Sequence, residues 1–235
     1  MGVLFVTGTG TGVGKTVVTA ALAALALSRG SCAVVKPAQT GLLADEPGDL
    51  AEVVRLAGPV ATRELARYPD PLSPAAAARA SGRPPLDPAL FYDVCLRLTE
   101  DLVLIEGAGG LLVRFDEDGT TLADLARGLR APVLVVVDAA LGTLNHTALT
   151  LEALAHRGLE LSGIVIGSWP LEPGLAERSN LADLEMLAAR PLLGALPAGA
   201  GALSGEEFLE VARASLAPQL GGRFDARAFR RTWDR

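Results

Sequence analysis

The sequence predicts an α/β fold in a single domain, with a doubly wound, mostly parallel sheet flanked by helices. Short continuous apolar runs alternate with helical patterns along almost the whole chain. Such runs are typical of parallel strands that helices cover on both faces. Half of the 235 residues are hydrophobic, which is enough for a large core. No repeat, linker or low-complexity tail divides residues 1–235, so we expect one domain.

Each element follows from its own pattern. Apolar runs predict strands at residues 2–7, 32–36, 102–105, 132–137, 161–166 and 191–196. Helical patterns predict helices at 15–29, 50–57, 88–99, 122–130, 144–156, 175–188 and 205–220. Residues 68–88 are rich in Pro, Ala and Gly and predict a loop around a short helix at 74–80. In such sheets ligands bind beyond the C-terminal ends of the strands, so we look for a site there.

Composition and charge exclude several classes of protein. No apolar run reaches the roughly 18 residues that span a bilayer, and no cleavable signal pattern begins the chain, so we expect a cytoplasmic protein without a membrane partner. The net charge of −6 argues against a nucleic-acid partner. The basic C-terminal segment is expected to be a short docked helix with a solvated basic face. Its arginines are Arg223, Arg227, Arg230, Arg231 and Arg235. Cys32 and Cys95 have no CxxC partner and are expected to be buried rather than to form a disulfide or zinc site.

A glycine-rich turn, Gly8–Thr16, joins the first strand to the first helix. Its glycines allow consecutive backbone N–H groups to face an anion, and the helix N-terminus adds partial positive charge. Thr9 stands where the usual G-x4-G-K-[ST] spacing has its first glycine, so the turn fits G-x5-G-K-T from Gly8. Strand, turn and helix nevertheless predict a P-loop NTPase-like nucleotide site, with Lys15 on the β/γ-phosphates and the Thr16 hydroxyl on Mg2+. The nucleotide-binding residues expected here are Gly12, Val13, Gly14, Lys15, Thr16 and Val17.

Two carboxylates are candidates for the same metal ion. Glu106 directly follows the third apolar run, where P-loop proteins carry a metal-binding acid. The Gly107, Ala108 and Gly109 backbone that follows it can approach a ligand closely. Asp49 stands at the start of a predicted helix, so it is a candidate both for the helix N-cap and for a metal ligand.

The scarcity of lysine singles out Lys36. Of the 21 basic residues other than histidine, only Lys15 and Lys36 are lysines. Both lie near the C-terminal end of a predicted strand, where a compact ammonium suits an anion with developing charge. We therefore predict that Lys15 and Lys36 are catalytic, with the hydroxyl of Thr40 nearby. The alternative is that Lys36 is a surface lysine beside a turn.

Together, five segments resemble the dethiobiotin synthetase family. They are VTGTGTGVGKT at residues 6–16, KPAQTG at 36–41, Asp49 after its loop, IEGAGG at 105–110 and LGTLNH at 141–146. The resemblance covers about residues 2–201 and leaves 202–235 as a C-terminal helix and tail. It implies a cyclo-ligase of biotin biosynthesis that uses ATP, Mg2+ and CO2 or bicarbonate to convert 7,8-diaminononanoate to dethiobiotin, through a carbamate and a carbamic-phosphoric anhydride.

The resemblance also implies roles for individual residues. The metal ligands would be Thr16, Asp49 and Glu106. Further nucleotide contacts would come from Asp49, Glu106, Gly107, Ala108, Gly109, Gly167, Ser168, Pro197, Ala198 and Gly199. Substrate contacts would come from Thr11, Lys36, Thr40, Pro71 and Gly109. The family is homodimeric with its site near the interface, so Gly142, Thr143, Leu144 and Asn145 of the partner would hold the substrate carboxylate. Asn145 is also a candidate helix cap.

The sequence departs from the family pattern at the base site. Gly167 stands where well-known members have an asparagine that reads adenine. Without a side-chain amide, we expect looser nucleotide choice, in which ATP works and CTP or other triphosphates compete. Trp169 is a candidate for stacking on a base or for packing. Ala75 replaces the histidine that often follows the Ser-Pro of the substrate loop.

Other functions remain as alternatives. A P-loop nucleotide switch or partitioning-type ATPase would typically carry an additional lysine early in the loop, and residues 8–14 contain none. A GTPase would need an N-K-x-D-like base reader, which residues 166–169 do not provide. A domain that had lost catalysis is disfavoured because Lys15, Lys36, Thr16, Asp49 and Glu106 are all present.

Overall fold

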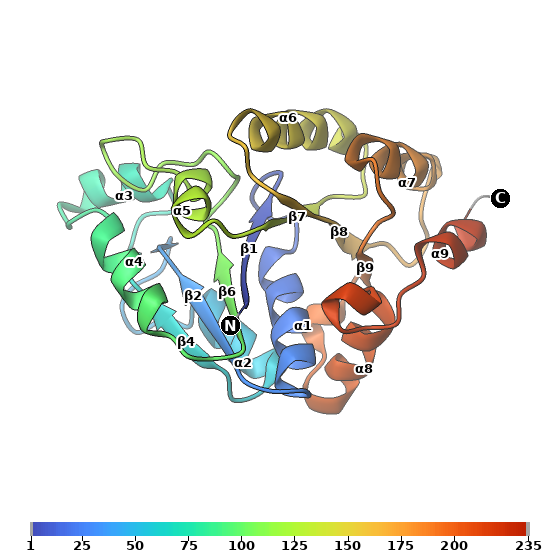
Figure 1. The fold of residues 1–235 in the computed structure, drawn as a ribbon, viewed down its shortest axis with the longest axis horizontal. Helices are drawn as coiled ribbons and strands as arrows, with labels where there is room; N and C mark the ends of the chain where they lie inside the picture. The colour runs from blue at the N-terminus through green and yellow to red at the C-terminus, as the bar shows by residue number, and fades with distance from the viewer. Residues whose placement is uncertain (1, 234–235) are drawn as a thin grey trace.

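A seven-stranded parallel sheet forms the centre of the protein, as seen in a computed structural model that describes residues 2–233 (Figure 1). Met1, Asp234 and the predicted tail residue Arg235 lie outside the described residues. The strand order is β4-β2-β6-β1-β7-β8-β9. The strands are β1 (Gly2–Gly8), β2 (Cys32–Lys36), β4 (Ala61–Glu64), β6 (Leu102–Glu106), β7 (Val133–Val137), β8 (Leu161–Trp169) and β9 (Gly194–Pro197).

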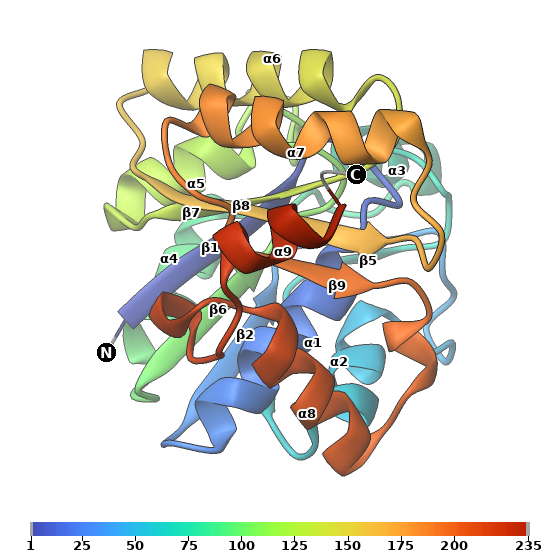
Figure 2. The same ribbon diagram turned by 90° about the vertical axis from the view of Figure 1, so that its right-hand side faces the viewer.

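Helices cover both faces of the sheet. Figure 2 shows α5, α6 and α7 on one side and α1, α2 and α8 on the other. Two separate hydrophobic cores match these two layers: Phe5 and Ile105 belong to one, and Val6 and Leu104 to the other. The α-helices are α1 (Lys15–Leu27), α2 (Asp49–Ala57), α3 (Pro74–Ser81), α4 (Pro88–Arg97), α5 (Leu122–Leu129), α6 (Thr143–His156), α7 (Leu175–Ala188), α8 (Gly205–Ser215) and α9 (Ala226–Trp233).

The predicted fold class is confirmed. Successive residues of one strand are buried in opposite cores, which explains why the strands appear in the sequence as unbroken apolar runs. All six predicted strands and the predicted helices form, with ends that shift by a few residues. The short helix within residues 68–88 is α3, and the basic C-terminal segment forms α9.

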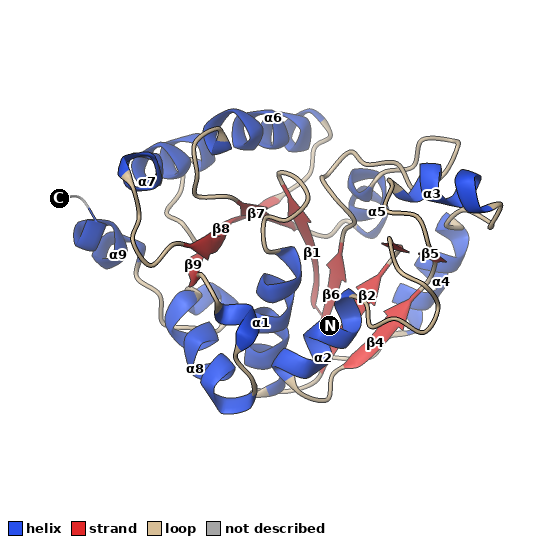
Figure 3. Cartoon of the chain, turned by 180° about the vertical axis from the view of Figure 1, so that it is seen from behind, coloured by secondary structure: helices blue, strands red, loops and turns tan. Residues whose placement is uncertain are grey.

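Three features differ from the sequence prediction. β4 is an additional strand that pairs with β2 at the sheet edge and is only partly buried, so it carries no apolar run. β3 (Gln39–Thr40) and β5 (Arg67–Tyr68) pair as a second small sheet beside α3 (Figure 3). The helix predicted at 205–220 instead ends at Ser215, because Pro218 disfavours helical backbone in the residue before it.

Both cysteines are free and buried, as predicted. Burial raises the pKa of the Cys32 and Cys95 thiols to about 12, so neither supplies a thiolate near neutral pH. Between residues 2 and 233, no helix has the length and apolar character needed to cross a bilayer.

Candidate active site

The glycine-rich turn joins β1 to the N-terminus of α1. Gly14 caps α1 in the left-handed conformation, with φ 92°. A side chain there would also lie 2.7 Å from the carbonyl oxygen of Gly167 on β8, so glycine is required twice over. The Lys15 ammonium folds back over the turn and donates to the carbonyl oxygen of Gly10 at 2.8 Å. The backbone of the turn therefore curves around the Lys15 side chain.

A cleft of about 820 Å³ opens beside this loop at the C-terminal ends of the strands. It collects predicted residues from five separate segments of the chain. They are Thr11, Gly12, Gly14, Lys15, Thr16, Val17, Lys36, Thr40, Asp49, Pro71, Glu106, Gly107, Ala108 and Gly109. Most of the residues predicted to contact nucleotide, metal and substrate within one chain therefore line a single cleft.

Lys36 lies at the floor of the cleft between two carboxylates. Its Nζ atom is 2.5 Å from Asp49 Oδ2 and 2.7 Å from Glu106 Oε1. The Lys36 and Glu106 side chains are 3% and 1% exposed, whereas Asp49 is 35% exposed and faces the cleft. Burial opposes the charge on Lys36, but the two carboxylates outweigh it and raise its pKa above the ordinary value. Lys36 is therefore a buried ammonium, and its alternative as a surface lysine is wrong.

The same carboxylates fit a magnesium ion. The Thr16 hydroxyl donates to Glu106 Oε1 at 2.9 Å, and Lys36 Nζ joins Glu106 to Asp49, so the three predicted metal ligands lie close together. The second oxygen, Glu106 Oε2, is buried and has no hydrogen-bond partner among the described residues. Carboxylate and hydroxyl oxygens are the ligands that magnesium prefers. The N-cap alternative for Asp49 is wrong, because Gly48 precedes α2 as its cap and Asp49 is the first helical residue.

Lys15 differs electrostatically from Lys36. Burial, followed by repulsion from the Lys36 ammonium, lowers the pKa of Lys15 to about 8, although Glu106 and Asp49 act against the shift. An approaching triphosphate would favour the charged form again. Above about pH 8 the unliganded Lys15 is therefore mostly neutral, and an anion that binds there restores its proton.

Gln39 and Val113 are among the cleft residues that were not singled out from the sequence, as are Ala38 and Leu72. Gln39 Oε1 accepts from the backbone N–H of Asp49 at 2.9 Å, which fixes the start of α2 and so the position of the Asp49 carboxylate. Its only sequence signal is its place in the segment that follows Lys36. Val113 also lines the cleft, beside Gly109.

A second group of predicted residues lies behind the phosphate loop. A Cβ atom on Gly167 would overlap the carbonyl oxygen of Val13, so this backbone leaves no room for a side chain there. Trp169 pairs with Pro197, and its carbonyl oxygen accepts from the Ala198 N–H at 2.7 Å. Gly167–Ser168 and Pro197–Gly199 therefore form two adjoining segments, of which the first abuts the loop. Trp169 is 4% exposed and packs against α9, so the base-stacking alternative for it is wrong.

The third group lies away from the cleft at the start of α6. Gly142 is the N-cap of α6, so a capping role for Asn145 is wrong. Gly142 and Asn145 are exposed, Leu144 is half-buried, and the buried Thr143 donates its hydroxyl to the Asp138 carbonyl. Within one chain these residues do not reach the cleft lining.

Sequence comparison finds relatives that match the chain over almost its whole length. It is 64% identical to the ATP-dependent dethiobiotin synthetase BioD of Parafrankia sp. (strain EAN1pec), with 99% of each chain covered. The chain belongs to the dethiobiotin synthetase family. The family predicted from the sequence is thereby confirmed. The synthetase of Streptomyces avermitilis is 59% identical over 97% of this chain and 98% of its own length. A family model described as an AAA domain matches residues 3–201.

Structure comparison supports the fold. The septum site-determining protein MinD of Pyrococcus horikoshii, complexed with Mg-ADP, matches with a TM-score of 0.54 and 18% identity over 83% of this chain and 81% of its own. Chloroplast FtsY of Physcomitrella patens matches with a TM-score of 0.55 and 18% identity over 99% of this chain and 65% of its own. At such identities the likeness concerns the fold alone, and it confirms the predicted P-loop NTPase-like architecture.

The pKa of Lys15 predicts how nucleotide binding depends on pH. At roughly pH 9 the unliganded lysine is mostly neutral, so binding of Mg-ADP should take up about one proton, whereas near pH 6.5 it should take up almost none. The affinity should accordingly fall as the pH rises above about 8. Isothermal titration calorimetry in buffers of different ionisation enthalpy measures the proton uptake.

The Lys15→Arg variant is the matched control for this titration. A guanidinium stays charged throughout this pH range, so the proton uptake near pH 9 should disappear. Equal uptake by the variant and the wild type would assign the proton to another group.

Proposed function

We propose that this protein closes the ureido ring of dethiobiotin, as an ATP- and Mg2+-dependent cyclo-ligase of biotin biosynthesis acting on 7,8-diaminononanoate and CO2. One observation carries the proposal: the Lys36 ammonium lies 2.7 Å from Glu106 and 2.5 Å from Asp49, in the same cleft as the phosphate loop. Membership of the dethiobiotin synthetase family supports the same reaction.

The phosphate loop would hold the triphosphate of the nucleotide. Backbone N–H groups of Gly12–Val17 at the start of α1 suit phosphate oxygens, and Lys15 adds a positive charge. Thr16, Asp49 and Glu106 would hold Mg2+, which neutralises charge on the phosphates when bound. The Gly107–Gly109 backbone lines the same cleft, and a Cβ atom on Gly109 would lie 3.7 Å from the Thr11 hydroxyl.

The reaction places two anions side by side. One amine of the substrate takes up CO2 and loses a proton to give a carbamate. A carbamate oxygen attacks the γ-phosphorus and the nucleoside diphosphate leaves, which gives a carbamic-phosphoric anhydride. The second amine attacks the anhydride carbonyl, closes the ring and expels phosphate. The protein's contribution to such transfers is mainly positioning and charge stabilisation.

Lys36 is suited to bridge carbamate and phosphate. Its ammonium already lies beside the predicted metal ligands, so a small rotation would direct it toward the reacting groups. The hydroxyls of Thr11 and Thr40 line the same cleft and can donate to the carbamate. Pro71 and the Gly109 backbone would border the diamine chain.

A second copy of the chain would complete the site. The segment Gly142, Thr143, Leu144, Asn145 begins α6, and a helix N-terminus binds a carboxylate without a basic side chain. Since this segment is outside the cleft of its own chain, the substrate carboxylate would be held by the partner in a homodimer. Leu141, directly before it, is 88% exposed, as expected of a residue available to a partner.

A nucleotide switch without ligase activity is the second candidate, and no observation favours it. The MinD-like neighbours share the fold at 18% and 20% identity only. The loop residues 8–14 contain no lysine.

The reaction is tested by supplying 7,8-diaminononanoate, bicarbonate and Mg-ATP. We expect dethiobiotin, detected by mass spectrometry, and phosphate release that requires the diamine. Phosphate release at the same rate without the diamine, and no dethiobiotin, would contradict the ligase and favour the switch.

Replacing Lys36 by arginine tests the need for an ammonium. The planar guanidinium does not fit between Asp49 and Glu106 as the ammonium does, so kcat/KM for the diamine should fall by about tenfold or more. Thermal unfolding shows whether Lys36→Arg is folded. A folded variant with near-normal kcat/KM would mean that any cation serves at this position.

Nucleotide choice follows from Gly167. The backbone has no space for an amide side chain there. The base would therefore be contacted by backbone groups of Ser168 and Pro197–Gly199. The kcat/KM values for ATP and CTP should therefore differ by much less than about a hundredfold. Competition between ATP, CTP and GTP measures this, and a preference for ATP beyond that ratio would contradict the proposed base site.

A further inference from the structure

Four aromatic side chains gather at the sheet edge formed by β8 and β9. Trp169 at the end of β8 contacts Phe229 of α9 with ring centroids 5.2 Å apart, and Trp233 with centroids 5.8 Å apart. Phe224, in the connection before α9, contacts Phe229 at 5.1 Å. Only 4% of the chain is aromatic, and both of its tryptophans belong to this group. We call these four residues the aromatic cluster.

Trp169 lies where the end of β8 pairs with the end of β9. It directly follows the Gly167–Ser168 segment, and it pairs with Pro197 across an irregularity in the β8–β9 register. Its carbonyl oxygen accepts the N–H of Ala198 at 2.7 Å. Trp169 therefore joins the two segments that the proposed function assigns to the nucleotide base.

The first of these segments contacts the phosphate loop through its backbone, because Gly167 abuts Val13 and Gly14. Just beyond the second segment, a Cβ atom on Gly201 would lie 3.4 Å from the Val17 side chain of α1. Glycine backbones have more conformations to lose on binding than other residues. Packing by neighbouring residues is therefore needed to hold their arrangement, and Trp169, which joins the two segments, offers a buried side chain for it.

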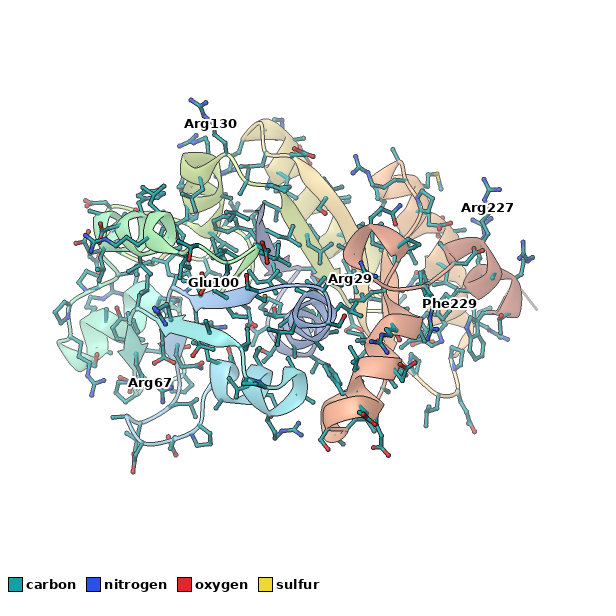
Figure 4. The ribbon with its side chains drawn as sticks, turned by 60° about the horizontal axis from the view of Figure 1, so that its bottom comes forward. Arg29, Arg67, Glu100, Arg130, Arg227 and Phe229 are labelled. Carbon is teal, nitrogen blue, oxygen red and sulfur yellow. The ribbon has the colours of Figure 1, made fainter. Side chains whose placement is uncertain are left out.

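The C-terminal helix supplies that packing. Phe229 and Trp233 of α9 contact Trp169. The Arg227 side chain of the same helix extends outward (Figure 4). Arg230 of α9 also pairs with Glu185 of α7 at 2.7 Å, which ties the helix to the layer beneath. The segment lies beyond residues 3–201 that the family model matches.

We propose that Phe229 and Trp233 are positioning residues for nucleotide binding: they clamp Trp169 and so hold the two base-contacting segments in their binding geometry. The proposal rests on the proposed function's base site. Loss of the clamp should affect the phosphate loop less than the base segments, because Gly8–Thr16 is held at its two ends by β1 and α1. The base-contacting segments would then be ordered only when the nucleotide binds, and that ordering costs conformational entropy.

The test compares a ligand that has a base with one that lacks it. Equilibrium binding of Mg-ATP and of magnesium tripolyphosphate is measured for the full-length wild type and Phe229→Ala. We expect the Kd for ATP to rise by about fivefold in the variant, the scale of one aromatic contact, while the Kd for tripolyphosphate stays within about twofold. Equal weakening of both ligands, or no change for ATP, would overturn the proposal.

Two further variants separate positioning from stability. Phe91→Leu removes a fully buried ring of α4 that contacts Phe5 of β1, which β7 separates from β8, and should leave the ratio of the two Kd values unchanged. Phe229→Leu keeps an apolar side chain in place should the alanine variant not fold, and its ratio should shift in the same direction. A Phe91→Leu shift as large as that of Phe229→Leu would also overturn the proposal.

Because binding and not turnover is measured, failure of this proposal is distinct from failure of the proposed reaction. A wild type that binds ATP no more tightly than tripolyphosphate has no base site, which would overturn the clamp whether or not dethiobiotin forms. A wild type that shows the expected ratios supports the clamp even where no dethiobiotin is made.

Discussion

The buried ion triad of Lys36, Glu106 and Asp49 determines how the rest of the site is arranged. An ammonium that is 3% exposed is stable only if carboxylates compensate it, and removing one partner from such a group costs about 3–5 kcal/mol. β2 and β6 are neighbours with Val35 opposite Ile105, so the next residues, Lys36 and Glu106, meet at the end of the sheet. Asp49 reaches the pair from α2, whose start is fixed by Gln39. The triad thus assembles at the strand ends a positive charge and the oxygens suited to a metal.

The surroundings of the two lysines shift their pKa values in opposite directions. Lys36 is held charged by the carboxylates, whereas burial and the neighbouring ammonium lower the pKa of Lys15 to about 8. Two ammonium groups in one small cleft repel each other until anions enter. The site is consequently most favourable when triphosphate and carbamate are both present, which is the condition that the proposed reaction requires.

Much of this was predictable because the signals are local. A strand buried on both faces requires an apolar run, and a strand end places Lys36 or Glu106 where ligands bind, so both follow from the order of residues. β4 was not predictable in the same way, because its half-exposed residues depend on pairing with the distant β2. The placement of Lys36 between two carboxylates, the overlap of any Gly167 side chain with Val13, and the packing of Trp169 under α9 are tertiary contacts. Spacing along the chain contains no information on them, which is also why Asp49 and Trp169 each had two open roles.

The most direct measurement is a crystal structure of the protein with Mg2+, a non-hydrolysable ATP analogue and 7,8-diaminononanoate. We predict that Lys36 Nζ leaves Glu106 Oε1 and lies within about 3 Å of a γ-phosphate oxygen or of the reacting end of the diamine, with the metal on Thr16, Asp49 and Glu106. A Lys36 side chain that stays between the two carboxylates, out of hydrogen-bond reach of every ligand atom, would contradict it.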